Sequence, residues 1–149
     1  SQQNRIVISP YIPSQSITTQ SLTINCTTLV AGALVRLLIY SDSNGLPNTK
    51  LYESTDLDCS TTGLKTVSTT FNFVAGTAYW IGYYGNQSPT LTNMLLGSMM
   101  SLQKTNATPS TNNFVSINDA CTFGSAPSTY NLGFGFAVTT NVLTYIRKA

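Results

Sequence analysis

Short apolar segments separated by turn residues are the feature that most limits how this chain can fold. Segments of four to twelve residues rich in Val, Ile, Leu, Thr, Tyr and Phe recur, and Gly, Pro, Asn or Asp lies between them. No stretch keeps the 3.6-residue period of an amphipathic helix. Short strands at this spacing are typical of sandwiches and barrels. We therefore expect an all-β protein.

The pattern predicts roughly eight to ten strands in a single domain, 1–149, arranged as a jelly-roll-like antiparallel β-sandwich. Prolines Pro10 and Pro13 are expected to end the first strand. The stretch 91–103 is ambiguous, because Met and Leu allow a helix whereas Gly97 and the flanking Thr and Ser favour one or two strands. The other expected strands cover residues 4–8, 17–28, 34–40, 50–58, 64–74, 77–84, 114–117, 130–138 and 142–147.

Residues 41–47 (SDSNGLP) give the strongest turn signal. Asn44 and Gly45 both tolerate positive φ, so they predict a two-residue hairpin turn. Asp42 and Asn44 also resemble part of a calcium loop. The EF-hand spacing and its closing bidentate acid are absent, and a plain hairpin explains the same residues. We expect no metal site here.

Charged residues make up only 8% of the chain, while Thr (23), Ser (17) and Asn (13) supply most of its polarity. These residues disfavour helix interiors, because their side chains compete for backbone hydrogen bonds. The seven basic residues are scattered, so the clustered positive charge of a nucleic-acid interface is missing. No apolar run approaches the roughly 20 residues that cross a bilayer. We expect neither a nucleic-acid partner nor membrane insertion.

The three cysteines, Cys26, Cys59 and Cys121, lie far apart in the sequence and form no CxxC pair. Neither a zinc site nor a thioredoxin-type motif is supported. Free buried thiols, in a protein made in a reducing cytosol, are the favoured interpretation. One intrachain disulfide is the alternative.

Catalytic sites are poorly supported. The chain has no histidine, which excludes Ser-His-Asp and Cys-His arrangements. Glu53, Asp56 and Asp58 cluster in the sequence and could suggest a pair of acid/base carboxylates. They lie beside an expected turn, where solvated acids are ordinary. We expect no catalytic residue, no cofactor-binding residue and no cofactor.

The strand 77–84 is the most aromatic. Alternation places Tyr79, Ile81 and Tyr83 on one face and Trp80 and Tyr84 on the other. One set belongs to the core. The other could stack on sugars or anchor a partner, because Tyr and Trp combine an apolar body with a polar tip. Alternatively, both sets are buried, one of them in a subunit interface. Tyr79, Trp80, Tyr83 and Tyr84 are thus the candidate binding or interface residues.

Residues 17–84 resemble a β-sandwich module of structural proteins of tailed bacteriophages, found in tail fibres, head fibres and receptor-binding proteins. The shared features are a G-x-x-V-R-L-x-I-Y strand, an S-D-x-N-G-x-P turn, an S-T-T-G-x-K segment and a G-x-x-Y-W strand. Here they fall on Gly32–Tyr40 with one differing spacer, Ser41–Pro47, Ser60–Lys65 and Gly76–Trp80. Residues 85–149 do not obviously match.

The resemblance implies part of a longer virion chain, made in the host cytoplasm and displayed on the virion surface. It implies a homotrimer that contacts other virion proteins, with host-surface glycans as candidate ligands. Low charge and many Tyr, Thr and Asn residues suit stable interfaces, so self-association is expected on composition as well. The alternative is a carbohydrate-binding or adhesion module of a secreted bacterial protein. That alternative predicts a monomer, a disulfide and exposed aromatic residues.

Overall fold

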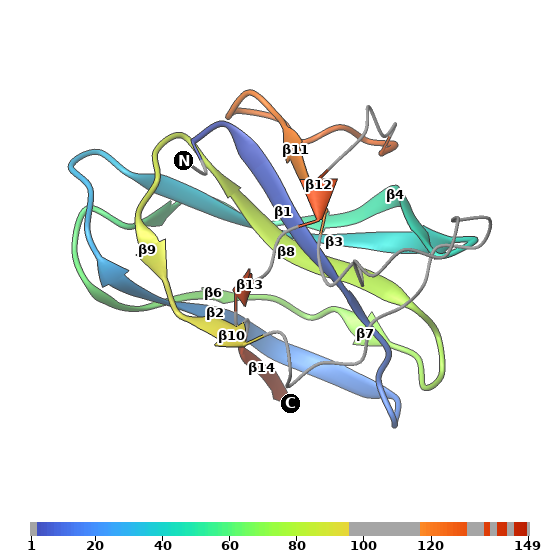
Figure 1. Cartoon of the computed structure of the whole chain (residues 1–149). Coiled ribbons are helices and arrows are strands. Elements are labelled where there is room, and N and C mark those ends of the chain that lie inside the picture. Colours follow the sequence, from blue (N-terminus) through green and yellow to red (C-terminus); the bar gives the residue numbers. More distant parts are fainter. Residues whose placement is uncertain (1–2, 96–116, 131–135, 138–139, 143–144, 149) are drawn as a thin grey trace.

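The computed structural model describes residues 3–95, 117–130, 136–137, 140–142 and 145–148 (Figure 1). These residues form fourteen strands, four of which have only two residues, and they include no helix. Every pairing between the strands is antiparallel. The expected all-β sandwich is confirmed.

Two sheets face each other across the molecule (Figure 1). The larger has seven strands, in the order β12 (Phe136–Ala137), β11 (Ile117–Ala120), β1 (Arg5–Tyr11), β8 (Tyr79–Gly85), β3 (Leu34–Ser43) and β4 (Leu46–Glu53), with β5 (Leu57–Asp58) also paired with β3. The smaller has five, in the order β14 (Tyr145–Lys148), β2 (Ile17–Thr28) and β6 (Gly63–Ser68), with β7 (Asn72–Phe73) and β9 (Thr90–Leu91) also paired with β2. A separate ribbon joins β10 (Asn93–Leu95) to β13 (Thr140–Val142).

The main core lies between the two sheets. Alternation in β2 directs Leu22, Ile24 and Cys26 inward, as the sequence predicts, because successive side chains of a strand point to opposite faces. The inward side chains of the larger sheet include Val35, Leu37 and Ile39 of β3. Phe73, Tyr79, Tyr11 and Phe71 add a group of edge-to-face aromatic contacts at one end.

A second apolar cluster covers the opposite face of the larger sheet. Its members are Ile6, Ile8, Leu38, Tyr40, Trp80, Tyr84, Ile117, Ala126 and Tyr130. Several of them alternate with main-core residues along the same strands, so β1, β3 and β8 are apolar on both faces. Such strands read as nearly continuous apolar runs, as residues 34–40 do apart from Arg36. The sheet therefore needs a cover on each side.

The hairpin predicted at Asn44-Gly45 is confirmed. Ser43 pairs with Leu46, and the two residues between them have φ values of 55° and 76°. Positive φ at both central positions defines a type I′ turn, whose twist matches that of the flanking strands. The backbone N–H of Gly45 donates to the Asp42 carboxylate (3.1 Å), which fixes the turn further.

The first strand is longer than predicted, because Pro10 does not end it. β1 continues to Tyr11, and Pro10 lies opposite Trp80 of β8. β11 pairs only with residues Arg5 to Ile8, so β1 is an edge strand beyond that point. An edge tolerates a proline, whose missing N–H faces no partner strand. In the ambiguous stretch 91–103, residues 91 and 93–95 are strand, and the remainder lies outside the described residues.

Candidate functional site

The four aromatic residues selected as candidate binding residues lie on β8 and are all buried. Tyr79 and Tyr83 face the core between the sheets, and Trp80 and Tyr84 face the opposite side, as the alternation predicts. Their exposed fractions are 6%, 6%, 2% and 0%. None of these rings is accessible for stacking on a sugar at the surface of the described chain.

The outer set, Trp80 and Tyr84, is covered by the chain itself. The segment 121–130, which we call the strap, follows β11 and contributes Cys121, Phe123, Ala126 and Tyr130 to the outer cluster. Figure 1 shows it in orange, on the side of the larger sheet away from β2 and β6. The second aromatic face thus has an intramolecular cover, whereas the sequence left open either an exposed binding face or a subunit interface.

Side chains of the sheet hold the strap through its backbone carbonyl groups. Arg36 Nη1 donates to Gly124 O (2.7 Å), Lys50 Nζ to Ala126 O (2.6 Å), and the Tyr40 hydroxyl to Pro127 O (2.8 Å). Two of these donors are cations, and hydrogen bonds from charged donors are the stronger kind. The contacts need no particular strap side chain.

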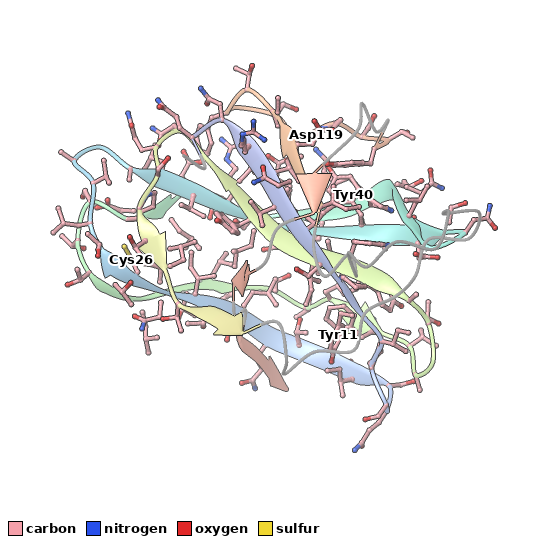
Figure 2. All side chains as sticks on the ribbon, in the orientation of Figure 1. Tyr11, Cys26, Tyr40 and Asp119 are labelled. Atoms are coloured by element: carbon pink, nitrogen blue, oxygen red, sulfur yellow. The ribbon has the colours of Figure 1, made fainter. Side chains whose placement is uncertain are left out.

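The end of the strap pairs with the edge strand β4 through backbone hydrogen bonds. Lys50 N donates to Ser128 O (2.8 Å) and Tyr130 N donates to Asn48 O (2.7 Å), so the strap runs beside β4 like a short extra strand. The Tyr130 ring packs edge-to-face on Tyr40, with centroids 5.5 Å apart (Tyr40 is labelled in Figure 2). The open edge of β4 is thereby partly covered.

A network of four charged side chains surrounds the strap contacts. Arg36 pairs with Glu53 (2.9 Å) and with Asp56 (2.5 Å), and Lys50 pairs with Glu53 (2.6 Å). The Tyr84 hydroxyl also donates to Glu53, and the guanidinium of Arg36 lies 5.1 Å from the centroid of the Phe123 ring. The network therefore links β3, β4, β8 and the strap.

Glu53 is held in its ionised form. Burial raises its pKa, but hydrogen bonds from Lys50, Tyr84 and Arg36 together outweigh that effect and lower the pKa to about 2. Burial and the hydrogen bond to Glu53 raise the pKa of Tyr84 to about 12. A carboxylate with such a low pKa cannot donate a proton near neutral pH, and both groups lie far from the range useful for acid/base catalysis.

The three acids that cluster in sequence do not form one site. The structure brings Glu53 and Asp56 together, but only through Arg36 between them. Asp58 instead accepts hydrogen bonds from the backbone and hydroxyl of Ser60, and these contacts lower its pKa. No pair of facing carboxylates with open space between them results, as glycoside hydrolysis would require.

Asp42 belongs to the turn and to the aromatic packing. One of its carboxylate oxygens accepts from Trp80 Nε1 (2.8 Å) and the other from Gly45 N. This bond satisfies the only polar atom of the buried Trp80 side chain. Among the residues that the structure describes, no group of three His, Cys, Asp or Glu side chains could hold a metal ion.

The sequence pattern did not predict the strap, nor that Arg36 and Lys50 bind its carbonyl groups. The strap reads CTFGSAPSTY, a turn-like composition without a strand period. One signal was present: Arg36 interrupts an otherwise apolar strand, and a partly buried cation needs an acidic partner. Its partners are 17 and 20 residues away in the sequence. Nothing in the sequence pointed to the strap carbonyl, which is 88 residues away.

All three cysteines are free thiols in the structure. Cys26 and Cys59 are buried together between the sheets, whereas Cys121 lies in the strap, on the other side of the larger sheet. Free thiols were the interpretation favoured on the sequence.

Comparison with models of protein families, with curated proteins and with solved structures gives no match. No helix of the length and hydropathy needed to cross a membrane occurs among the described residues. The fold thus defines the class as an antiparallel β-sandwich, and the outer face of its larger sheet is a site of intramolecular packing.

Proposed function

We propose that this chain is a non-enzymatic structural domain of a bacteriophage virion surface protein, and that it self-associates, as a homotrimer, and packs against other virion proteins. The proposal combines the resemblance of residues 17–84 with the charge arrangement of the folded domain. Self-association is the part that the geometry supports best.

The observation that carries the proposal is that the charged side chains form hydrogen bonds or ion pairs within the chain. Nine charged residues have described side chains, and each of them makes a hydrogen bond or an ion pair within the chain. They are Arg5, Arg36, Asp42, Lys50, Glu53, Asp56, Asp58, Lys65 and Asp119. Four of them, Arg36, Lys50, Glu53 and Asp56, neutralise one another in ion pairs, and the cores of protein interfaces are depleted in charged residues.

The residues that carry the phage resemblance have structural roles in this chain. Gly32 and Gly76 have φ values of 70° and 72°, and Asn44-Gly45 forms the type I′ turn. Val35, Leu37 and Ile39 fill the main core, and Trp80 anchors the outer cluster. The shared motif is thus a motif of fold, which supports a common module and supplies no binding or catalytic residue.

A non-catalytic role agrees with the state of the acidic residues. Glu53 is fixed as a carboxylate by three donors, and Asp42 is occupied by Trp80 and the turn. A general acid or base needs a pKa near the working pH, whereas the pKa of Glu53 is about 2, and both carboxylate oxygens of Asp42 already accept hydrogen bonds within the chain.

Sedimentation equilibrium at micromolar concentration, in reducing buffer, tests the proposal. We expect a species of three times the 16.0 kDa chain mass. Native mass spectrometry gives an independent subunit count. A monomer across the concentration range would contradict self-assembly and would favour the carbohydrate-binding module of a secreted bacterial protein.

A further inference from the structure

Two thiols meet in the main core at one end of the sandwich. Cys26 lies near the end of β2 in the smaller sheet, and Cys59 directly follows β5 of the larger sheet. Both are buried, with exposed fractions of 1% and 0%. Figure 2 shows Cys26 at one end of the molecule and Tyr11 at the other. A bond between the two sulfur atoms would therefore join the two sheets.

The backbone holds these residues close to each other. The Cys26 thiol lies within hydrogen-bonding distance of two carbonyl oxygens, Thr28 O (3.5 Å) and Cys59 O (3.8 Å), and it is also a hydrogen-bonding neighbour of the Cys59 thiol. Cys26 is fixed between two partner strands, opposite Gly63 on one side and Leu91 on the other. Cys59 is fixed by its N–H, which donates to Ala33 O (2.8 Å).

The third cysteine cannot take part in this pair. Cys121 packs in the outer cluster with the strap, and the larger sheet separates it from Cys26 and Cys59. Its thiol donates to the carbonyl of Thr122 (3.7 Å). The odd number of cysteines thus divides into one buried pair and one separate thiol.

We propose that Cys26 and Cys59 form an inter-sheet disulfide when the domain folds in the presence of a small-molecule disulfide oxidant such as oxidised glutathione. The thiolate of one cysteine attacks the oxidant, which releases one reduced glutathione and leaves a mixed disulfide. The second cysteine displaces the other glutathione. Two thiols lose two protons and two electrons, and the oxidant is reduced to two thiols.

In the folded state the reaction is slow. Burial raises the pKa of the Cys59 thiol to about 12, so the reactive thiolate is scarce at neutral pH. Burial also keeps glutathione away from both sulfur atoms. Oxidation therefore takes place during folding or after local opening, and the finished domain keeps whichever state it folded in. This inference concerns the core and does not depend on the proposed virion role.

The disulfide would stabilise the domain. It closes a loop between residues that are 33 positions apart, which restricts the unfolded chain. We expect the melting temperature to rise by roughly 10 °C relative to the reduced protein.

The test uses the Cys121→Ser variant, which retains only the buried pair. The variant is refolded from denaturant with a mixture of reduced and oxidised glutathione, and in parallel with a phosphine reductant. We expect the glutathione sample to lose the mass of two hydrogen atoms, to yield a peptide linked through Cys26 and Cys59, and to melt at the higher temperature.

The matched control combines Cys121→Ser with Cys59→Ala. This variant cannot form the disulfide, so we expect it to have the same melting temperature after refolding in either buffer. Two alkylatable thiols in the Cys121→Ser protein after refolding with oxidised glutathione would overturn the proposal. So would a disulfide that forms but lowers the melting temperature, since the geometry would then be strained.

Discussion

Gly82 of β8 pairs with Ile8 of β1, and the backbone of β1 leaves no room there for a side chain. A Cβ atom added at this residue would overlap the carbonyl oxygen of Val7 and lie 2.7 Å from the Cα atom of Ile8. Both obstacles are backbone, so neither can move without separating the two strands. Glycine within a strand often marks such an approach. We expect Gly82→Ala to lower the free energy of unfolding by about 3 kcal/mol or more, measured by urea denaturation.

Gly76→Ala is the matched control for that substitution. Gly76 has a φ of 72° but has no atom within 4 Å of an added Cβ. The left-handed conformation alone should cost about 1 kcal/mol. Equal losses for the two variants would contradict the close contact with β1 as the reason for glycine at Gly82.

Glu53 gives the domain a defined dependence on pH. Its pKa is about 2 in the folded state and near 4.5 when unfolded, so its contribution to stability is complete above the unfolded pKa. The contribution is lost as the pH falls from about 5 to 2. We expect Glu53→Gln to cost about 1–3 kcal/mol at pH 7. The gap in stability between wild type and variant, followed by denaturation, should narrow as the pH approaches 2.

A constant gap from pH 7 to pH 2 would be inconsistent with the lowered pKa. Asp119→Asn serves as the control, because the hydrogen bond seen to its carboxylate comes from the backbone N–H of the neighbouring Ala120. Its effect should be within about 0.5 kcal/mol of wild type.

At the level of elements, the β3–β4 hairpin depends on its two turn residues. Valine is β-branched and tolerates positive φ poorly, so Gly45→Val should destabilise the domain by about 1 kcal/mol or more. Asn44→Gly keeps a residue that adopts the observed φ of 55° and should change the melting temperature little. Thermal denaturation of both variants checks the assignment, and an unchanged Gly45→Val protein would contradict it.

The strap can be followed through Trp80, the single tryptophan. Ala126 of the strap is buried in the outer cluster together with Trp80, and Ser125 beside it is exposed. Ala126→Asp places an unpaired charge in an apolar site, which should release the strap. We expect a red shift of the tryptophan emission and greater quenching by acrylamide. Ser125→Asp should leave both signals unchanged.

Emission that stays unchanged in a folded Ala126→Asp protein would mean that the strap is not what covers Trp80. Circular dichroism in the far ultraviolet shows whether that variant retains its strands, so loss of the strap is distinguished from global unfolding.

At the scale of the whole molecule, the internal charge pairing predicts how assembly responds to salt. Contacts between exposed charges weaken as salt is added, because the Debye length falls from about 10 Å at 0.1 M to about 3 Å at 1 M. Of the nine charged residues with described side chains, four form ion pairs with one another (Arg36, Lys50, Glu53 and Asp56), and the other five hydrogen-bond to uncharged groups. We therefore expect the dissociation constant of the oligomer to change less than tenfold between these salt concentrations, measured by sedimentation. A steep loss of affinity would place charged residues at the interface.

The strands and the hairpin were predictable because they depend on neighbouring residues. Alternation of Leu22, Ile24 and Cys26 fixes which face of β2 is buried, and Asn44-Gly45 fixes the turn. The same alternation correctly divided Trp80 and Tyr84 from Tyr79 and Tyr83. The sequence could not show what covers Trp80 and Tyr84, because alternation defines a face without naming its cover.

The sequence by itself therefore determined the all-β class, the positions of β2, β3 and β8 and the turn type, since each follows from local periodicity and backbone preference. The tertiary structure alone decided that the strap covers the outer aromatic face, that Arg36 meets Gly124, and that Cys26 meets Cys59. These contacts join residues 33 to 88 positions apart. They arise from how the sheets pack, which no local pattern encodes.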